Sequence, residues 1–212
     1  MVRPAMTTKK KKIRPLSAKK RKSILDQAAR LFLKNGFGAI SMDEISEAAE
    51  VSKRTLYNHF PTKKILFCEI VKLEWQKVSY RKIHKPHIHK PEDIFTAIMG
   101  HVLKTMYSAR MQNLLKLVIA ESDNFPELKT LQAEYGLEPL IDDFSSYIVY
   151  LNEKCVLDVD NPRIAVAQYI GLVKECLYWP WLLGVISKPS KKHQKEIIQR
   201  ANKIFFTYYR VR

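Results

Sequence analysis

The segment 41–64, SMDEISEAAEVSKRTLYNHFPTKK, places hydrogen-bond donors and cations on one side of a short helix. Ser52 is a typical N-cap residue, so the helix is expected to begin directly after it. Leu56 and Phe60 lie four residues apart and are expected to face the core. The exposed side then carries Lys53, Arg54, Thr55, Tyr57, Asn58 and His59. Such a face suits the major groove of DNA, where base edges are recognised by hydrogen bonds.

A second short helix is predicted immediately before this one. Ser41 stands three residues before Glu44, which is the spacing of a capping box. Apolar side chains follow at helical spacing: Met42, Ile45, Ala48 and Ala49. Glu50 and Val51 leave only a tight turn before Ser52, so the sequence predicts a helix-turn-helix.

Longer helices are expected on both sides of this pair. The helix over 17–35 has one apolar face, and Gly36 suits the left-handed residue that follows many helices. A fourth helix opens at Pro61-Thr62 and is expected to reach about Lys82. Lys63 and Lys64 lie in its first turn, where cations oppose the helix dipole. That conflict indicates either a nearby phosphate or a solvated face.

Five more helices are predicted in the rest of the chain. Their expected ranges are 91–106, 114–122, 126–155, 162–181 and 191–209. No segment has the alternating pattern of a strand, and no repeat is present. The sequence therefore predicts an all-α fold.

The positive charge is concentrated at the N-terminal end. The chain of 212 residues has a formal net charge of +16 and a pI of about 9.7. Residues 1–64 contain 16 Lys and Arg against 5 Asp and Glu, whereas residues 65–212 contain 21 against 16. This asymmetry places the contact with a polyanion at the N-terminal end. Residues 1–16 form a basic flexible tail, which either lies along DNA or remains solvated.

Three cysteines, Cys68, Cys155 and Cys176, lie far apart and form no CxxC pair. We expect reduced, mostly buried thiols in a cytoplasmic protein, with a redox sensor as the alternative. No apolar run approaches the roughly 20 residues that span a membrane, and the basic N-terminus has no apolar signal-peptide core. A membrane partner is therefore not expected.

The sequence offers little for metal binding or catalysis. Three histidines, His84, His87 and His89, lie close together, but no cysteine or carboxylate ligand stands near them before Glu92. A flexible charged loop is the preferred interpretation, so no metal is expected. No nucleophile elbow, phosphate-binding glycine loop or HExxH motif is present, and we expect neither a cofactor nor an enzyme.

The predicted helix-turn-helix and its flanking residues resemble a known family. The stretch VSKRTLYNHFPTKKILF, preceded by Asn35-Gly36-Phe37 and SMDEISEAAE, resembles the DNA-binding domain of TetR-family transcriptional regulators over roughly residues 20–70. Later, LKLVIAESDNFPELKTL and NPRIAVAQYIGLVKECLYWPWLLG resemble the AefR-like branch. The resemblance implies about nine helices, three in a DNA-binding domain over 17–64 and six in a ligand-binding and dimerisation domain over 65–212.

The resemblance also implies roles for single residues. Four residues occupy positions that face base edges in the family: Lys53, Arg54, Thr55 and Asn58. Arg54 would pair with guanine and Asn58 with adenine. Those at positions that contact phosphates are Ser41, Ser52, Tyr57, His59 and Lys63. For His59 the alternative is that it only caps or packs the turn.

The C-terminal aromatic residues either line an apolar pocket or belong to the ordinary core. They are Trp75, Phe95, Tyr107, Phe144, Tyr147, Tyr178, Trp179 and Trp181. The first six of these are the predicted ligand-binding residues. Segment 165–177 carries two apolar stripes. A single chain could bury both only by enclosing the helix, whereas a dimer would cover the second.

The resemblance implies a homodimeric repressor that binds double-stranded DNA at a palindromic operator and is released by a small apolar effector. The alternative is a regulator or activator without such an effector, controlled by a protein partner. A basic enzyme acting on nucleic acid is disfavoured, because acids and metal ligands do not cluster.

Overall fold

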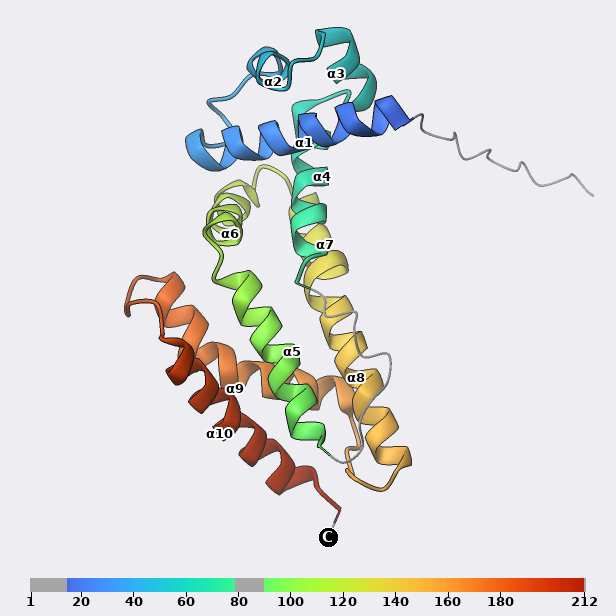
Figure 1. Ribbon diagram of the computed structural model, residues 1–212, viewed down its shortest axis with the longest axis vertical. Coiled ribbons are helices and arrows are strands. Elements are labelled where there is room, and N and C mark those ends of the chain that lie inside the picture. Colours follow the sequence, from blue (N-terminus) through green and yellow to red (C-terminus); the bar gives the residue numbers. More distant parts are fainter. Residues whose placement is uncertain (1–14, 79–89, 212) are drawn as a thin grey trace, which may run out of the picture. The chain divides into compact units, whose positions relative to one another are not determined.

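The computed structural model describes residues 15–78 and 90–211 (Figure 1). The regular secondary structure of the described residues is helical, apart from one isolated β-bridge between Leu157 and Arg210. The predicted all-α fold is therefore confirmed. The chain divides into two compact units, one ending at Glu69 and the other beginning at Ile70. This boundary falls within helix α4 (Lys63–Trp75), whereas the sequence places the domain boundary after Lys64. The basic tail up to residue 14 and the three histidines at 84–89 lie outside the described residues.

The first unit contains α1 (Pro15–Asn35), α2 (Met42–Ala48), α3 (Lys53–His59) and the start of α4. Helix α2 packs against both α1 and α3 (Figure 1). The small core is aromatic, because Phe32 and Phe67 meet edge to face with ring centroids 5.7 Å apart, and Phe37 lies 5.1 Å from Phe67. Edge-to-face pairs of this kind stabilise a core beyond the burial of their area.

Left-handed residues end the first two helices. Gly36 follows α1 with a φ of +86° and donates from its N–H to the carbonyl of Phe32. After α2, Glu50 has a φ of +53°, and the next N–H, that of Val51, returns to the carbonyl of Ser46. This bond pattern is that of a Schellman motif, which turns the chain sharply into α3.

The second unit contains the remaining helices. They are α5 (Pro91–Met106), α6 (Ala109–Glu121), α7 (Glu127–Gln132), the π-helical segment η1 (Ala133–Leu137), α8 (Glu138–Glu153), α9 (Pro162–Leu182) and α10 (Lys191–Tyr209). Because α7, η1 and α8 follow without a break, they form the one long helix that the sequence predicts. Counted in this way, the described residues form nine helices, as the family resemblance implied.

The core of the second unit lies where α5, α8, α9 and α10 meet. Phe95 is at its centre, with its ring centroid 4.5 Å from Phe144, 4.9 Å from Tyr169 and 5.0 Å from Phe205. The Tyr169 hydroxyl donates to Asn202 Oδ1 at 2.5 Å, so this buried polar pair is satisfied.

Two helix boundaries differ from the prediction. Helix α4 ends at Trp75, well before Lys82, because tertiary contacts hold the turn that follows. The buried Glu74 carboxylate pairs there with Lys77 at 2.7 Å and with Arg110 of α6 at 2.8 Å. Helix α6 begins at Ala109, earlier than predicted, because Ser108 accepts a hydrogen bond from the Met111 N–H as an N-cap.

One statement about burial was wrong, and one open alternative is decided by the structure. Cys155 and Cys176 are exposed and only Cys68 is half-buried, although the thiols were expected to be mostly buried. The two apolar stripes of segment 165–177 are covered within one chain, except for Leu172 and Cys176. The cover comes from α5, α8 and α10, which all pack against α9, so the second stripe needs no partner subunit.

Within the described residues, no helix is long and apolar enough to cross a membrane.

Candidate nucleic-acid interface and ligand pocket

Helix α3 has one buried and one exposed side, as the spacing predicts. Leu56 and Phe60 are buried, at 0% and 1% exposure. Four side chains project into solvent: Lys53, Arg54, Tyr57 and Asn58. Thr55 and His59 are half-buried. The first unit therefore presents two cations, an amide and an aromatic ring on one short helix.

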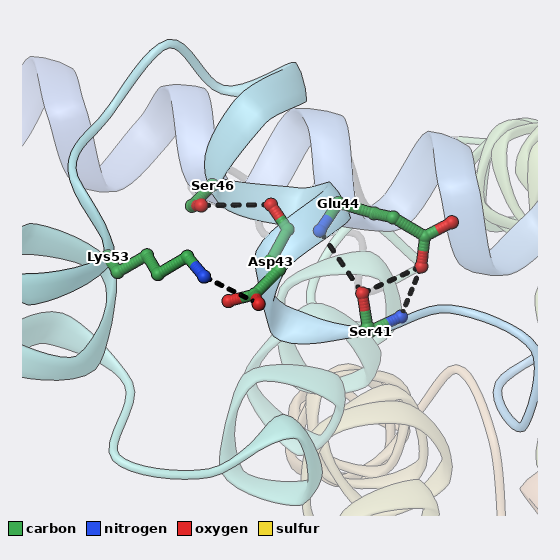
Figure 2. A network of polar contacts seen from close by, with 5 residues as sticks. All are labelled: Ser41, Asp43, Glu44, Ser46 and Lys53. Carbon is green, nitrogen blue, oxygen red and sulfur yellow. Dashed lines mark hydrogen bonds and ion pairs between the residues drawn. The ribbon is translucent and has the colours of Figure 1, made fainter.

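The N-terminus of α2 is fixed by the predicted capping box (Figure 2). The Glu44 N–H donates to Ser41 Oγ at 3.2 Å, and the Ser41 N–H donates back to Glu44 Oε2 at 2.7 Å. These bonds from Ser41 hold the pKa of the Glu44 carboxyl below its usual value. Ser41 itself is exposed, so its hydroxyl lies at the surface where a phosphate contact is expected.

Lys53 is paired across the turn with a residue of α2. Its Nζ lies 2.6 Å from Asp43 Oδ2, with both side chains exposed (Figure 2). The hydrogen bond to Asp43 raises the pKa of Lys53. An exposed pair of this kind contributes little stability, so Lys53 can exchange Asp43 for a DNA acceptor at small cost.

Ser52 and Thr55 fix the start of α3. The Thr55 N–H donates to Ser52 Oγ at 3.2 Å, and their two hydroxyl oxygens lie 2.9 Å apart. Of these two side chains, Ser52 is the exposed one. Ser52 and Thr55, both predicted to contact DNA, thus also form the N-cap that fixes the start of α3.

Lys63 has a structural role that the sequence did not indicate. Its Nζ donates to the carbonyls of Ile40 at 2.7 Å, Phe37 at 2.9 Å and Gly38 at 3.4 Å, and lies 4.4 Å from the Phe37 ring centroid. An ammonium group has three donors, so this loop uses all of them. The bonds explain the cation at the start of α4 without a phosphate, and contact of Lys63 with DNA stays a prediction.

The second unit contains a cavity of about 230 Å³. Its lining residues come from α4, α5, α6, α7, η1, α8, α9 and the turn after α4: Trp75, Val78, Val102, Met106, Leu115, Gln132, Gly136, Leu137, Leu140, Ile170, Lys174, Tyr178 and Trp179. The volume is just under the range of about 300 to 1,000 Å³ typical of small-molecule pockets. The π-helical segment brings Gly136 against the Trp75 indole, where an added Cβ would lie 2.7 Å from the ring.

The six aromatic residues predicted to bind ligand are divided between several places. Trp75 and Tyr178 line the cavity. Phe95, Phe144 and Tyr147 pack in the core with one another instead, because Phe95 fills the space between α8 and α10. Tyr107 donates from its hydroxyl to the Leu177 carbonyl at 2.9 Å and lines a separate surface hollow among lysines. A ligand site therefore has to rely on Trp75 and Tyr178 among these six.

Two family models match the chain. One, described as the AefR-like transcriptional repressor C-terminal domain, covers residues 93–211, and the other, described as bacterial regulatory proteins of the tetR family, covers residues 24–70. The chain belongs to the TetR family of transcriptional regulators. It is thus a DNA-binding regulator rather than an enzyme.

Individual relatives agree with this membership. The regulator QacR of Staphylococcus aureus is 47% identical over 57 residues, which are 26% of this chain and 30% of QacR. A solved TetR-family regulator from Mesorhizobium loti has a TM-score of 0.80 at 22% identity, covering 93% of this chain and all of the other. The flavonoid-responsive regulator FrrA has a TM-score of 0.79 at 28% identity, covering 92% and 99%. The chain spans half or less of the length of the first curated relatives it matches.

Within this TetR-family chain, the sequence interpretation left out several residues that bear on the two candidate sites. Lys19, Lys20 and Lys22 are exposed on α1 and add positive charge to the DNA-binding unit. Their run directly after the basic tail was the available signal. Lys174 lines the cavity, and it follows Ile170 and precedes Tyr178 by four residues each. In the sequence, Lys174 lies on the same helix face as Ile170 and Tyr178, and this single cation on an apolar face was the signal for a ligand contact.

Proposed function

We propose that the protein is a homodimeric, ligand-responsive repressor whose α3 recognises a two-fold symmetric operator. The observation that carries the proposal is the pairing, in one chain, of an exposed polar face on α3 with a cavity in the other unit. Arg54 and Asn58 would recognise base edges, and Ser41, Ser52 and Tyr57 would position the protein on phosphates. A DNA-binding repressor of this kind acts in the cytoplasm.

Exposed apolar residues support the homodimer. On α9 they are Ile164, Leu172, Trp179 and Leu183, and on α10 they are Ile204 and Tyr208. The four α9 residues follow one another at spacings of eight, seven and four residues. These spacings place them in one stripe along the helix. Tyr208 is 80% exposed and Leu183 is 73% exposed in the single chain. A symmetric pairing of the α9–α10 faces would cover this surface and set the distance between two copies of α3.

Helix α4 supports a link between ligand and DNA. Its first residue, Lys63, holds the loop before α2 in the first unit, and its last residue, Trp75, lines the cavity of the second. We propose that a ligand displacing Trp75 shifts α4 and thereby changes the separation of the two α3 helices in the dimer. Coupling of this kind is typically about 1–3 kcal/mol and is reciprocal.

One structural neighbour supports an aromatic effector. FrrA is named as a flavonoid-responsive regulator, and we propose an effector of similar aromatic character for this protein. The cavity argues against the alternative of a regulator controlled only by a protein partner, since that alternative requires no internal space for a ligand.

Binding of labelled operator DNA, followed by fluorescence anisotropy during titration with flavonoids and other aromatic compounds, tests the proposal. An effector should weaken operator binding by about 5- to 150-fold, and operator should weaken effector binding by the same factor. A ligand that binds equally well with and without operator would not be an effector, because equal affinity for two states shifts neither. Failure of every cavity ligand to release the operator would contradict the proposed mechanism.

A further inference from the structure

Two residues that line the cavity each carry a buried donor without a partner among the described residues. Trp75 Nε1 and the Tyr178 hydroxyl are buried, and neither forms a hydrogen bond with any described residue. Trp75 is 4% exposed and Tyr178 is fully buried. Buried polar groups are nearly always hydrogen-bonded, and an unpaired one is costly. A ligand that moves the lining enough to reach these two atoms would supply the missing acceptors.

Lys174 adds an uncompensated cation to the same wall. It is half-buried on α9, with its Nζ 5.0 Å from the Trp179 ring centroid and 5.8 Å from that of Tyr178. The ring faces attract the ammonium group but do not neutralise it. Burial lowers the pKa of Lys174, and no carboxylate among the described residues opposes this effect. A bound anion would stabilise the charged form.

The other lining residues define the rest of the ligand. They are apolar except for the Gln132 amide, and none of those described is acidic. Burial raises the pKa of Tyr178 to about 12, so its hydroxyl keeps its proton near neutral pH and can donate it. The wall thus combines aliphatic and aromatic surface with several donors and one cation.

We propose that the cavity binds a small aromatic organic anion, with its carboxylate, sulfonate or phenolate group held by Lys174 and further oxygen atoms accepting from Trp75 and Tyr178. This inference rests on the proposed function, since the same cavity is the effector site. It changes the sequence-based expectation of an apolar effector to that of an amphipathic one. A purely apolar ligand would leave both donors and the cation without partners.

Two fluorescent probes that share one aromatic skeleton test the charge requirement. Anilinonaphthalene sulfonate carries an anionic group, and phenylnaphthylamine is its uncharged counterpart. The full-length protein and its variant Lys174→Gln are titrated with both at constant ionic strength, and Lys192→Gln, an exposed lysine of α10 outside the cavity, is the matched control. We expect Lys174→Gln to weaken sulfonate binding about tenfold. Phenylnaphthylamine binding and the Lys192→Gln control should stay unchanged.

A sulfonate affinity that is the same in Lys174→Gln and wild type would overturn the inference, as would equal losses for both probes. Tyr178→Phe, which removes one hydroxyl and keeps the ring, provides a second variant and should weaken the sulfonate about fivefold. Anisotropy of labelled operator separates the inference from the proposed function. Lys174-dependent binding of the sulfonate without any operator release would support the anion site and contradict its role as an effector site.

Discussion

Arg54 and Asn58 lie four residues apart on the exposed face of α3. Arg54→Ala or Asn58→Ala should cost about 1–3 kcal/mol in operator binding and relax the preference at one base pair. The loss should be specific because each side chain is proposed to form a bidentate pair with one base. Gel-shift titrations with operators changed at single positions measure it, and Lys22→Ala on α1 is a control that should weaken all sequences alike. Unchanged specific binding by Arg54→Ala would remove its assignment.

Lys63 combines a predicted phosphate contact with three observed carbonyl contacts. Lys63→Met keeps the apolar stem but leaves the loop carbonyls without their donor. We therefore expect a loss of about 1–3 kcal/mol in the free energy of unfolding, measured by urea denaturation. Lys22→Met, an exposed lysine of α1, should change it by less than about 0.5 kcal/mol. Equal stability of the two variants would show that the carbonyl contacts contribute nothing.

At the scale of elements, the end of α1 depends on one glycine. Gly36 has a φ of +86°, where a side chain is strained, and an added Cβ would meet no atom within 4 Å. Gly36→Ala should therefore cost about 1–2 kcal/mol through backbone strain alone. Gly38 lies in the same loop, also has open space around it, and is not left-handed, so Gly38→Ala is the matched control. Similar unfolding curves for both variants would contradict this account.

Local signals predicted the elements of the first unit well. The caps at Ser41 and Ser52, the left-handed Gly36 and the inward pair Leu56 and Phe60 were all confirmed. Each depends on neighbours within about four residues, which a single sequence displays. The donors of Lys63 could not be assigned in this way, because its carbonyl partners lie 23 to 26 residues earlier.

The second unit was harder to predict because its sites depend on long-range packing. Phe95, Phe144 and Tyr147 have the spacing of core and pocket residues alike, and only the packing of α5 on α8, α9 and α10 placed them in the core. The π-helical segment was not predicted, since the contact between Gly136 and Trp75 joins positions far apart in sequence.

At the scale of the whole molecule, the proposed dimer face can be tested directly. Leu172→Glu together with Ile204→Glu places charge on the exposed stripes of α9 and α10. Because a charged group is costly to bury without a partner, the double variant should be monomeric and should lose specific operator binding. Sedimentation velocity gives the mass, and Lys154→Glu, exposed after α8, is a control for added charge. A double variant that remains dimeric would place the interface elsewhere.

The selection of binding sites from random double-stranded DNA by the full-length protein tests the central claim most directly. One α3 from each subunit of a symmetric dimer should enrich a two-fold symmetric sequence. Its half-sites should lie about one helical turn, or a close multiple of one turn, apart. Enrichment of a single asymmetric sequence, or no enrichment over the starting pool, would contradict sequence-specific recognition of an operator by paired α3 helices.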